Sequence, residues 1–217
     1  MAQPSSAVDL ALVLAIDGSG SVSTERLMLQ IHGYSDAFRQ AELVRTIRAG
    51  RRGRIAATFV EWSDAGRQTQ SVGWTLIEDA ETAQGFADAI LTAYGPTPGW
   101  TSISGGIDFS IGLLARLRPN ADRRVIDVSG DGANNDGRPV EAARDAAVAA
   151  GITINGLPIL EVEPDLDRYY RDHVIGGPQA FLVVARNESS IAAAVMDKLL
   201  VEVAGGHDRT MSAGERA

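Results

Sequence analysis

Nearly unbroken hydrophobic runs alternate along the chain with segments in which hydrophobic residues recur every three or four positions. Residues 8–16, VDLALVLAI, are almost entirely apolar, which is typical of a parallel strand buried on both faces. In residues 24–49 the apolar positions follow helical spacing, as at Leu27, Ile31 and Phe38. The chain therefore begins with a buried strand followed by an amphipathic helix.

The same alternation continues to the C-terminal end. A polar/apolar alternation in residues 68–75 predicts an antiparallel edge strand, and Gly-Pro-Thr-Pro-Gly at 95–99 predicts a loop. Pro139 and Gly151 mark the start and end of one helix. The predicted strands are residues 8–16, 54–62, 68–75, 123–129, 152–158 and 181–185. The predicted helices are residues 24–49, 79–94, 102–117, 139–150, 163–173 and 187–203.

Strands that alternate with helices predict an α/β fold. We expect a doubly wound, mostly parallel six-stranded sheet flanked by helices on both faces, similar to a Rossmann fold, with the strand order 3-2-1-4-5-6. The pattern contains no internal repeat or linker, so we expect a single domain at residues 8–203. Residues 1–7 and 204–217 are expected to be flexible termini.

The amino-acid composition excludes several classes of function and argues against others. The 217 residues carry a formal net charge of −8, which argues against a general nucleic-acid-binding protein, because such proteins need a basic face. The chain contains no cysteine, so thiolate nucleophiles, zinc–thiolate sites and iron–sulfur clusters are excluded. Its longest apolar runs are far shorter than the roughly 20 residues that cross a bilayer.

Residues 1–9 give an indication of the cellular location of the protein. Residues 1–9 lack both the basic start and the apolar segment of a signal peptide. Residues 2–6, AQPSS, instead resemble a short remnant left after a leader has been removed. We therefore expect a periplasmic or secreted protein, and the sequence leaves a cytoplasmic location open.

Oxygen-bearing side chains follow two of the predicted strands and precede one helix. Asp17, Ser19 and Ser21 alternate with glycines directly after the first strand. Thr101 opens a helix, and Asp131 follows the strand at 123–129. Ligands of open α/β sheets bind at the carboxyl ends of the strands, so these five residues are expected to meet at one edge.

Two carboxylates and three hydroxyls, without nitrogen or sulfur ligands, suit a hard divalent cation. We expect one such ion, with Mg²⁺ favoured and Mn²⁺ and Ca²⁺ as alternatives. Each piece has a simpler explanation when taken alone. Asp131-Gly132 is a common turn, and Thr101 on its own is an ordinary helix cap. Their combination and order favour the metal site.

This order of motifs resembles the von Willebrand factor A (VWA) domain and its metal-ion-dependent adhesion site (MIDAS). Asp17-x-Ser19-x-Ser21, the segment at 101–107 and the run VIDVSGDG at 125–132 carry the resemblance, which covers residues 8–203. The last run is similar to that of an uncharacterised bacterial subgroup. The resemblance implies metal ligation by Ser19, Ser21 and Thr101, with Asp17 and Asp131 binding directly or through water.

The resemblance further implies that an acidic side chain of an unidentified protein partner completes the coordination. Membrane insertion and nucleic-acid binding are not expected. Three positions depart from the family pattern, Trp100, Ser104 and Gly130, without removing a ligand. Trp100 and Asn134 are candidate rim residues that contact the partner; packing of Trp100 onto the sheet and ordinary turn chemistry at Asn134 remain the alternatives.

Enzymatic functions find little support. The chain lacks a phosphate-binding Gly-Lys pair and a Gly-x-Ser-x-Gly elbow, and Ser19 stands where an aspartyl phosphatase has its second aspartate. The histidines His32, His173 and His207 are distant from the site in sequence. We expect a non-catalytic, metal-dependent protein-binding module. The alternatives are a regulatory or assembly module for an ATPase or metal-insertion complex and, with less support, a metal-dependent hydrolase.

One charged residue falls inside a predicted buried strand. Asp127 must be paired there, because an isolated buried charge is costly. A neighbouring backbone group or an arginine is the expected partner.

Overall fold

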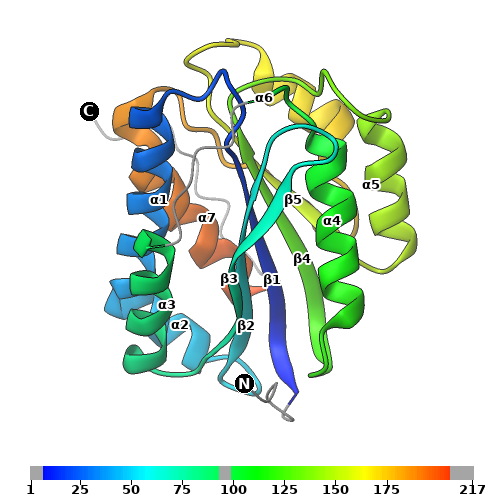
Figure 1. Ribbon diagram of the computed structural model, residues 1–217. Coiled ribbons are helices and arrows are strands. Elements are labelled where there is room, and N and C mark those ends of the chain that lie inside the picture. The colour runs from blue at the N-terminus through cyan, green and yellow to red at the C-terminus, as the bar shows by residue number, and fades with distance from the viewer. Residues whose placement is uncertain (1–6, 93–98, 206–217) are drawn as a thin grey trace.

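A central sheet with helices on both faces forms the fold (Figure 1). The computed structural model describes residues 7–92 and 99–205. The sheet has five strands in the order β3-β2-β1-β4-β5, and all neighbours are parallel except β2 and β3. The α/β class, the antiparallel edge and the order of these strands are confirmed. The strands are β1 Val8–Asp17, β2 Ile55–Trp62, β3 Gln68–Ile77, β4 Ala121–Gly130 and β5 Thr153–Pro158.

Strand β1 lies at the centre of the sheet and separates two hydrophobic cores. Leu10, Leu12 and Leu14 point into the core under α1, α2, α3 and α7. Ala11 and Val13 point into the other core, under α4 and α5. Alternation along a strand explains this division, because successive side chains face opposite sides of the sheet. The helices are α1 Thr24–Arg39, α2 Ala41–Arg48, α3 Ala80–Thr92, α4 Ile103–Arg116, α5 Val140–Ala149, α6 Leu166–Tyr169 and α7 Ile191–Ala204.

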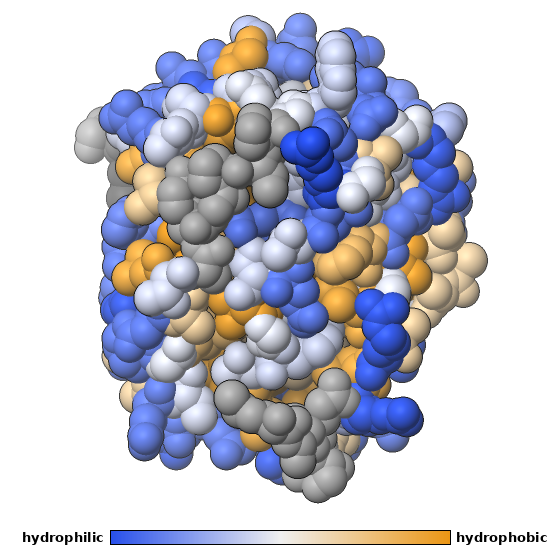
Figure 2. Space-filling model, in the orientation of Figure 1, coloured by the Kyte–Doolittle hydropathy of each residue, from blue (hydrophilic) through white to orange (hydrophobic). Residues whose placement is uncertain are grey.

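The face of the molecule shown in Figure 2 is mostly hydrophilic, with smaller scattered hydrophobic areas. None of the helices in residues 7–92 and 99–205 has the length and apolar character needed to cross a membrane. The predicted loop at 95–98 and the predicted flexible termini at 1–6 and 206–217 lie outside the described residues, as does His207.

Two predictions about the elements are corrected. The long helix predicted at residues 24–49 is two helices, because Gln40 takes extended dihedrals, φ −72° and ψ 127°, between α1 and α2. The predicted sixth strand at 181–185 forms only isolated bridges to β5, Gly156 with Leu182 and Ile159 with Ala185.

A missing donor explains the absent sixth strand. The Val183 N–H donates to the Gly156 carbonyl, and the Ala185 N–H donates to the Pro158 carbonyl. A parallel ladder between these two bonds also needs an N–H at position 158 directed at the carbonyl of Val183. Pro158 has no N–H, so the ladder is interrupted there and the sheet ends at β5.

Candidate metal centre

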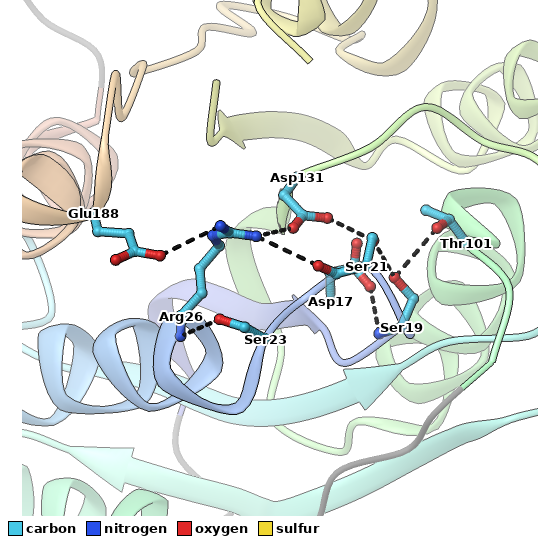
Figure 3. Close-up of polar contacts among 8 residues, drawn as sticks. All are labelled: Asp17, Ser19, Ser21, Ser23, Arg26, Thr101, Asp131 and Glu188. Carbon is cyan, nitrogen blue, oxygen red and sulfur yellow. Dashed lines mark hydrogen bonds and ion pairs between the residues drawn. The ribbon is translucent and has the colours of Figure 1, made fainter. Parts of the chain in front are cut away.

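The five predicted ligands meet at the carboxyl edge of the sheet, as Figure 3 shows. Asp17 ends β1, and Asp131 follows the last residue of β4. Both carboxylates are fully buried, and Ser19 and Thr101 are nearly so. Ser21 is the exposed member of the set. The structure thus brings the five side chains together, and their binding of a metal stays a prediction.

A continuous chain of hydrogen bonds joins the site oxygens. The Thr101 hydroxyl donates to Ser19 Oγ over 3.2 Å, and Ser19 Oγ lies 3.2 Å from Ser21 Oγ. Ser21 Oγ in turn donates to Asp131 Oδ1 over 2.8 Å. The backbone N–H of Ser19 donates to Asp17 Oδ1, also over 2.8 Å. Oxygens from three separate loops are thus held within hydrogen-bonding distance of one another.

The turn after β1 depends on a close backbone approach. The Gly20 N–H donates to the Gly99 carbonyl over 2.9 Å, and a Cβ at position 20 would lie only 3.2 Å from that oxygen. Glycine at this position lets the 17–21 turn contact the segment that carries Thr101.

Thr101 is not the helix cap that its position suggests. The cap of α4 is the next residue, Ser102, whose hydroxyl accepts a hydrogen bond from the Gly105 N–H. The backbone of Thr101 is fixed separately, because its N–H donates to Asn135 Oδ1 and its carbonyl accepts from the Asn135 N–H. The Thr101 hydroxyl is consequently directed to Ser19 and the site.

The Asp17 carboxylate is buried in a setting that disfavours its charged form. Desolvation raises the pKa of Asp17 to about 7, and the nearby charge of Asp131 adds to the rise, while hydrogen bonds from Ser19 oppose it. Asp17 Oδ2 is buried without a hydrogen-bond partner among the described residues. A divalent cation would supply the compensating charge, and the all-oxygen donor set fits Mg²⁺ or a similar hard ion.

An arginine absent from the sequence prediction enters the site from the first turn of α1. Arg26 Nη1 donates to Asp131 Oδ2 over 2.7 Å, and Nη2 donates to Glu188 Oε1 over 3.3 Å (Figure 3). Glu188 precedes α7, so Arg26 connects the Asp131 turn to the start of that helix. The only sequence signal is that Arg26 lies one helical turn beyond the motif that ends at Ser21.

The sequence prediction also omitted a further acidic residue, Glu163. Its carboxylate accepts hydrogen bonds from the Ala133 N–H at 3.2 and 3.3 Å. A Cβ on Gly132 would lie 3.5 Å from Glu163 Oε1 and 3.9 Å from Thr101 Oγ1, so this carboxylate borders the site. It lies in the loop after β5, which the motif pattern did not include.

The two candidate rim residues differ in exposure. The Trp100 side chain is 68% exposed beside Thr101, whereas Asn134 is partly buried. Asn134 Oδ1 accepts from the Ser104 N–H and its amide nitrogen donates to the Asp136 carbonyl, so its side chain ties the Asp131 loop to α4. Partner contact by either residue remains a prediction.

The other singled-out residues lie away from the site. His32 is exposed on α1, and His173 Nδ1 lies 2.7 Å from Glu141 Oε1. The sequence analysis expected an arginine or a neighbouring backbone group as the partner of Asp127, and this expectation is wrong. Asp127 pairs with Lys198 of α7, which also contacts Glu202 at 2.6 Å, within a fully buried cluster.

The architecture resembles solved VWA structures. The vWF domain of the type V pili tip protein Mfa5 from Porphyromonas gingivalis is 13% identical, with a TM-score of 0.65 and coverage of 97% of this chain and 99% of that one. The von Willebrand factor type A structure from Catenulispora acidiphila is 15% identical, with a TM-score of 0.63 and coverage of 91% and 43%.

A third similar structure is described with zinc at its own MIDAS motif. Proximal thread matrix protein 1 from the mussel byssus, in the form described with a zinc occupied MIDAS motif, is 18% identical, with a TM-score of 0.61 and coverage of 92% of this chain. The present chain spans about half, 48%, of that protein's length. No curated protein matches the sequence.

The sheet order and these likenesses define the class as the VWA fold. Residues 7–207 match the family described as Protein of unknown function (DUF1194), and the chain belongs to that family.

Proposed function

We propose that the chain is a metal-ion-dependent protein-binding module of the adhesion type. It holds one divalent cation, Mg²⁺ in the first instance, at Asp17, Ser19, Ser21, Thr101 and Asp131. The observation that carries the proposal is the meeting of these five oxygen-bearing side chains around a buried carboxylate that has an unpartnered oxygen, Asp17 Oδ2. Structures described as a pilus adhesin and as a pili tip domain share the fold.

The carboxylates and the hydroxyls have different roles in binding the ion. Asp17 and Asp131 offset the charge of the cation, and the three hydroxyls supply neutral oxygen ligands. The bound ion supplies a coordination position that an acidic partner side chain takes. Ser21 is the exposed hydroxyl of the set, so it marks the side from which a partner approaches.

The surroundings favour an acidic residue flanked by apolar ones. Trp100 is 68% exposed directly before Thr101, and Val162 is 51% exposed directly before Glu163, which borders the site. Exposed aromatic side chains next to a polar anchor are typical of interface centres. We therefore propose that a partner segment places its carboxylate on the ion and apolar side chains against this rim.

The proposal assigns no catalytic step to the site. A metal-dependent hydrolase needs a general base within hydrogen-bonding reach of the attacking water. The described histidines lie elsewhere, with His32 exposed on α1 and His173 paired to Glu141. Asp17 and Asp131 are the buried carboxylates of the site and both are assigned to the ion, and the bordering carboxylate of Glu163 accepts hydrogen bonds from the Ala133 N–H.

Selection from a displayed random-peptide library, run in parallel in Mg²⁺ and in EDTA, tests the function. The proposal predicts Mg²⁺-dependent peptides that share an aspartate or glutamate next to an apolar residue. Changing that acid to its amide, or changing Thr101→Val in the protein, should abolish binding. Selected peptides that bind equally in EDTA, or that lack an essential acidic residue, would contradict it.

A further inference from the structure

Two buried polar atoms converge beside the backbone of Gly130. Asp17 Oδ2 and the Tyr170 hydroxyl are both buried, and both lack a hydrogen-bond partner within residues 7–92 and 99–205. A Cβ built on Gly130 would lie 2.8 Å from the Tyr170 hydroxyl and 3.0 Å from Asp17 Oδ2. The two oxygens therefore lie close to the same point at the end of β4.

The fold makes room for this phenol at two strand positions. Tyr170 begins a short π-helical turn, Tyr170–Val174, and its side chain is fully buried against the sheet. A Cβ at Gly156 of β5 would lie 2.7 Å from the Tyr170 ring, and a Cβ at Gly130 would meet its hydroxyl. Glycine within a strand often marks such a close approach. Both glycines are therefore required by the position of one tyrosine.

The hydroxyl is the feature that packing alone does not explain. A buried hydroxyl without a partner destabilises a protein, and phenylalanine would fill the same space without that cost. Burial and the nearby carboxylates of Asp17 and Asp131 raise the pKa of Tyr170 well above 10, so the phenol stays protonated and remains a donor at neutral pH. A protonated donor facing an unpartnered carboxylate oxygen is suited to hold that carboxylate.

We infer that Tyr170 is a positioning residue for Asp17, and that its hydroxyl donates a hydrogen bond to Oδ2 when a cation occupies the site. The inference rests on the proposed function. Side chains that hydrogen-bond a metal ligand fix its orientation, and their loss typically weakens metal affinity about 10- to 100-fold. Tyr170 thereby connects the loop after β5 to the metal centre without touching the ion.

Tyr170→Phe tests the inference on the metal-free full chain. Calorimetric titration with MgCl₂ should show at least a roughly tenfold weaker Kd than for the wild type. Thermal unfolding of the metal-free variant should occur at the same temperature or a higher one, because the substitution removes an unpartnered buried hydroxyl. Weaker metal binding without lost stability is the signature of a positioning role.

Tyr34→Phe is the matched control. Tyr34 is equally buried, but its hydroxyl donates to Asp127 Oδ2 over 3.3 Å, in the core beneath α1 and α7. The same chemical change there should lower the thermal stability and leave Mg²⁺ affinity unchanged. A Mg²⁺-induced change in the near-ultraviolet tyrosine band should be present in the wild type and in Tyr34→Phe, and absent in Tyr170→Phe.

The outcomes separate this inference from the proposed function. Wild type that binds Mg²⁺, with Tyr170→Phe binding it equally well, overturns the role of Tyr170 and leaves the function standing. Wild type that binds no divalent cation overturns both. If Tyr170→Phe is too unstable to titrate, the near-ultraviolet tyrosine band of the wild type is the test. A band that does not change when Mg²⁺ is added overturns the inference.

Discussion

The Arg26 guanidinium and the Asp131 carboxylate form an ion pair of 2.7 Å inside the candidate metal centre. The Asp131 side chain is fully buried and that of Arg26 is 10% exposed, so water screens the pair only weakly. Arg26 thus supplies, from within the chain, part of the positive charge that a metal ion would bring to Asp131. An ion bound as proposed would therefore compete with the guanidinium for this carboxylate.

Replacing this arginine is expected to strengthen metal binding. In Arg26→Met the ion no longer competes with a guanidinium and no longer meets its positive charge, so Mg²⁺ should bind on the order of tenfold more tightly. The metal-free variant should be less stable by about 3 kcal/mol, because Asp131 is left as a buried carboxylate without its partner. Calorimetric titration and chemical denaturation without metal measure the two effects.

Glu188→Gln is the control for Arg26. It weakens the contact of the guanidinium with Glu188 Oε1 at 3.3 Å and leaves the pair with Asp131 in place. The Glu188 side chain is 36% exposed, so we expect a stability change below about 1 kcal/mol and unchanged Mg²⁺ affinity. Weaker metal binding in Arg26→Met would show instead that Arg26 holds Asp131 ready for the ion.

Two neighbouring hydroxyls should differ in their effect on Mg²⁺ affinity. Thr101→Val removes a proposed ligand and should lower Mg²⁺ affinity, and loss of its buried hydrogen bond to Ser19 should cost about 1 kcal/mol of metal-free stability. Ser102→Ala removes the cap of α4 and should cost about 1 kcal/mol of stability without changing the affinity. Titration and denaturation of both variants check this, and equal effects on Mg²⁺ affinity at the two positions would contradict the assignment.

Removing Lys198 alone from its buried cluster with Asp127 and Glu202 should destabilise the protein strongly. Burial alone would lower the pKa of Lys198, but the carboxylates of Asp127 and Glu202 hold it above its usual value. Lys198→Met leaves two buried carboxylates facing each other, and breaking a buried pair costs about 3–5 kcal/mol. Denaturant unfolding measures the loss.

The triple variant Asp127→Asn, Lys198→Met, Glu202→Gln removes all three charges from this cluster. It should recover a large part of the lost stability, since neutral groups avoid the unpaired buried charge. Unfolding of Lys198→Met at the same denaturant concentration as the wild type would show that the cluster contributes little.

Asp127 should make stability fall as pH rises. Burial and the charge of Glu202 raise its pKa to about 7, against the opposing effect of Lys198. Tyr34 donates to the same carboxyl from α1. A carboxyl whose folded pKa lies above its unfolded value of 3.8 favours folding while protonated, and this contribution is lost between those two values.

Unfolding of the metal-free protein between pH 5 and 7 tests this dependence, for which one group contributes at most about 1.4 kcal/mol per pH unit. Asp127→Asn mimics the protonated carboxyl, so its stability should fall less with pH than that of the wild type. The raised pKa of Asp17 also makes stability fall as pH rises, but it does so equally in the wild type and in Asp127→Asn. It therefore does not change the difference in pH dependence between the two proteins. Parallel curves would show that Asp127 does not titrate in this range.

The sequence was sufficient to place the two carboxylates at one edge of the sheet, because they lie at strand ends. Asp17 ends β1 and Asp131 directly follows β4, and the carboxyl ends of neighbouring parallel strands meet at the same edge. The same reasoning overextended the sheet, because Pro158 removes one ladder donor and leaves 181–185 with isolated bridges. Pro158 was visible in the sequence, but its effect depends on the register of residues 181–185 against β5, which only the structure shows.

The other residues that the sequence analysis did not identify are paired with residues far away along the chain. Arg26 and Asp131 are 105 residues apart, and Lys198 lies far from Asp127 along the chain. Such pairs depend on how α1 and α7 pack on the sheet, which hydrophobic periodicity does not specify. Tyr170 was missed for the same reason, because only the folded backbone shows that Gly130 and Gly156 make room for it.

Calorimetric titration of the metal-stripped protein with Mg²⁺, Mn²⁺ and Ca²⁺, with Asp17→Ala measured beside the wild type, tests the central claim most directly. The account predicts one-to-one binding of at least one of these ions to the wild type, and loss of that binding in the variant. A wild type that binds none of the three ions, or an Asp17→Ala variant that binds as tightly as the wild type, would contradict it.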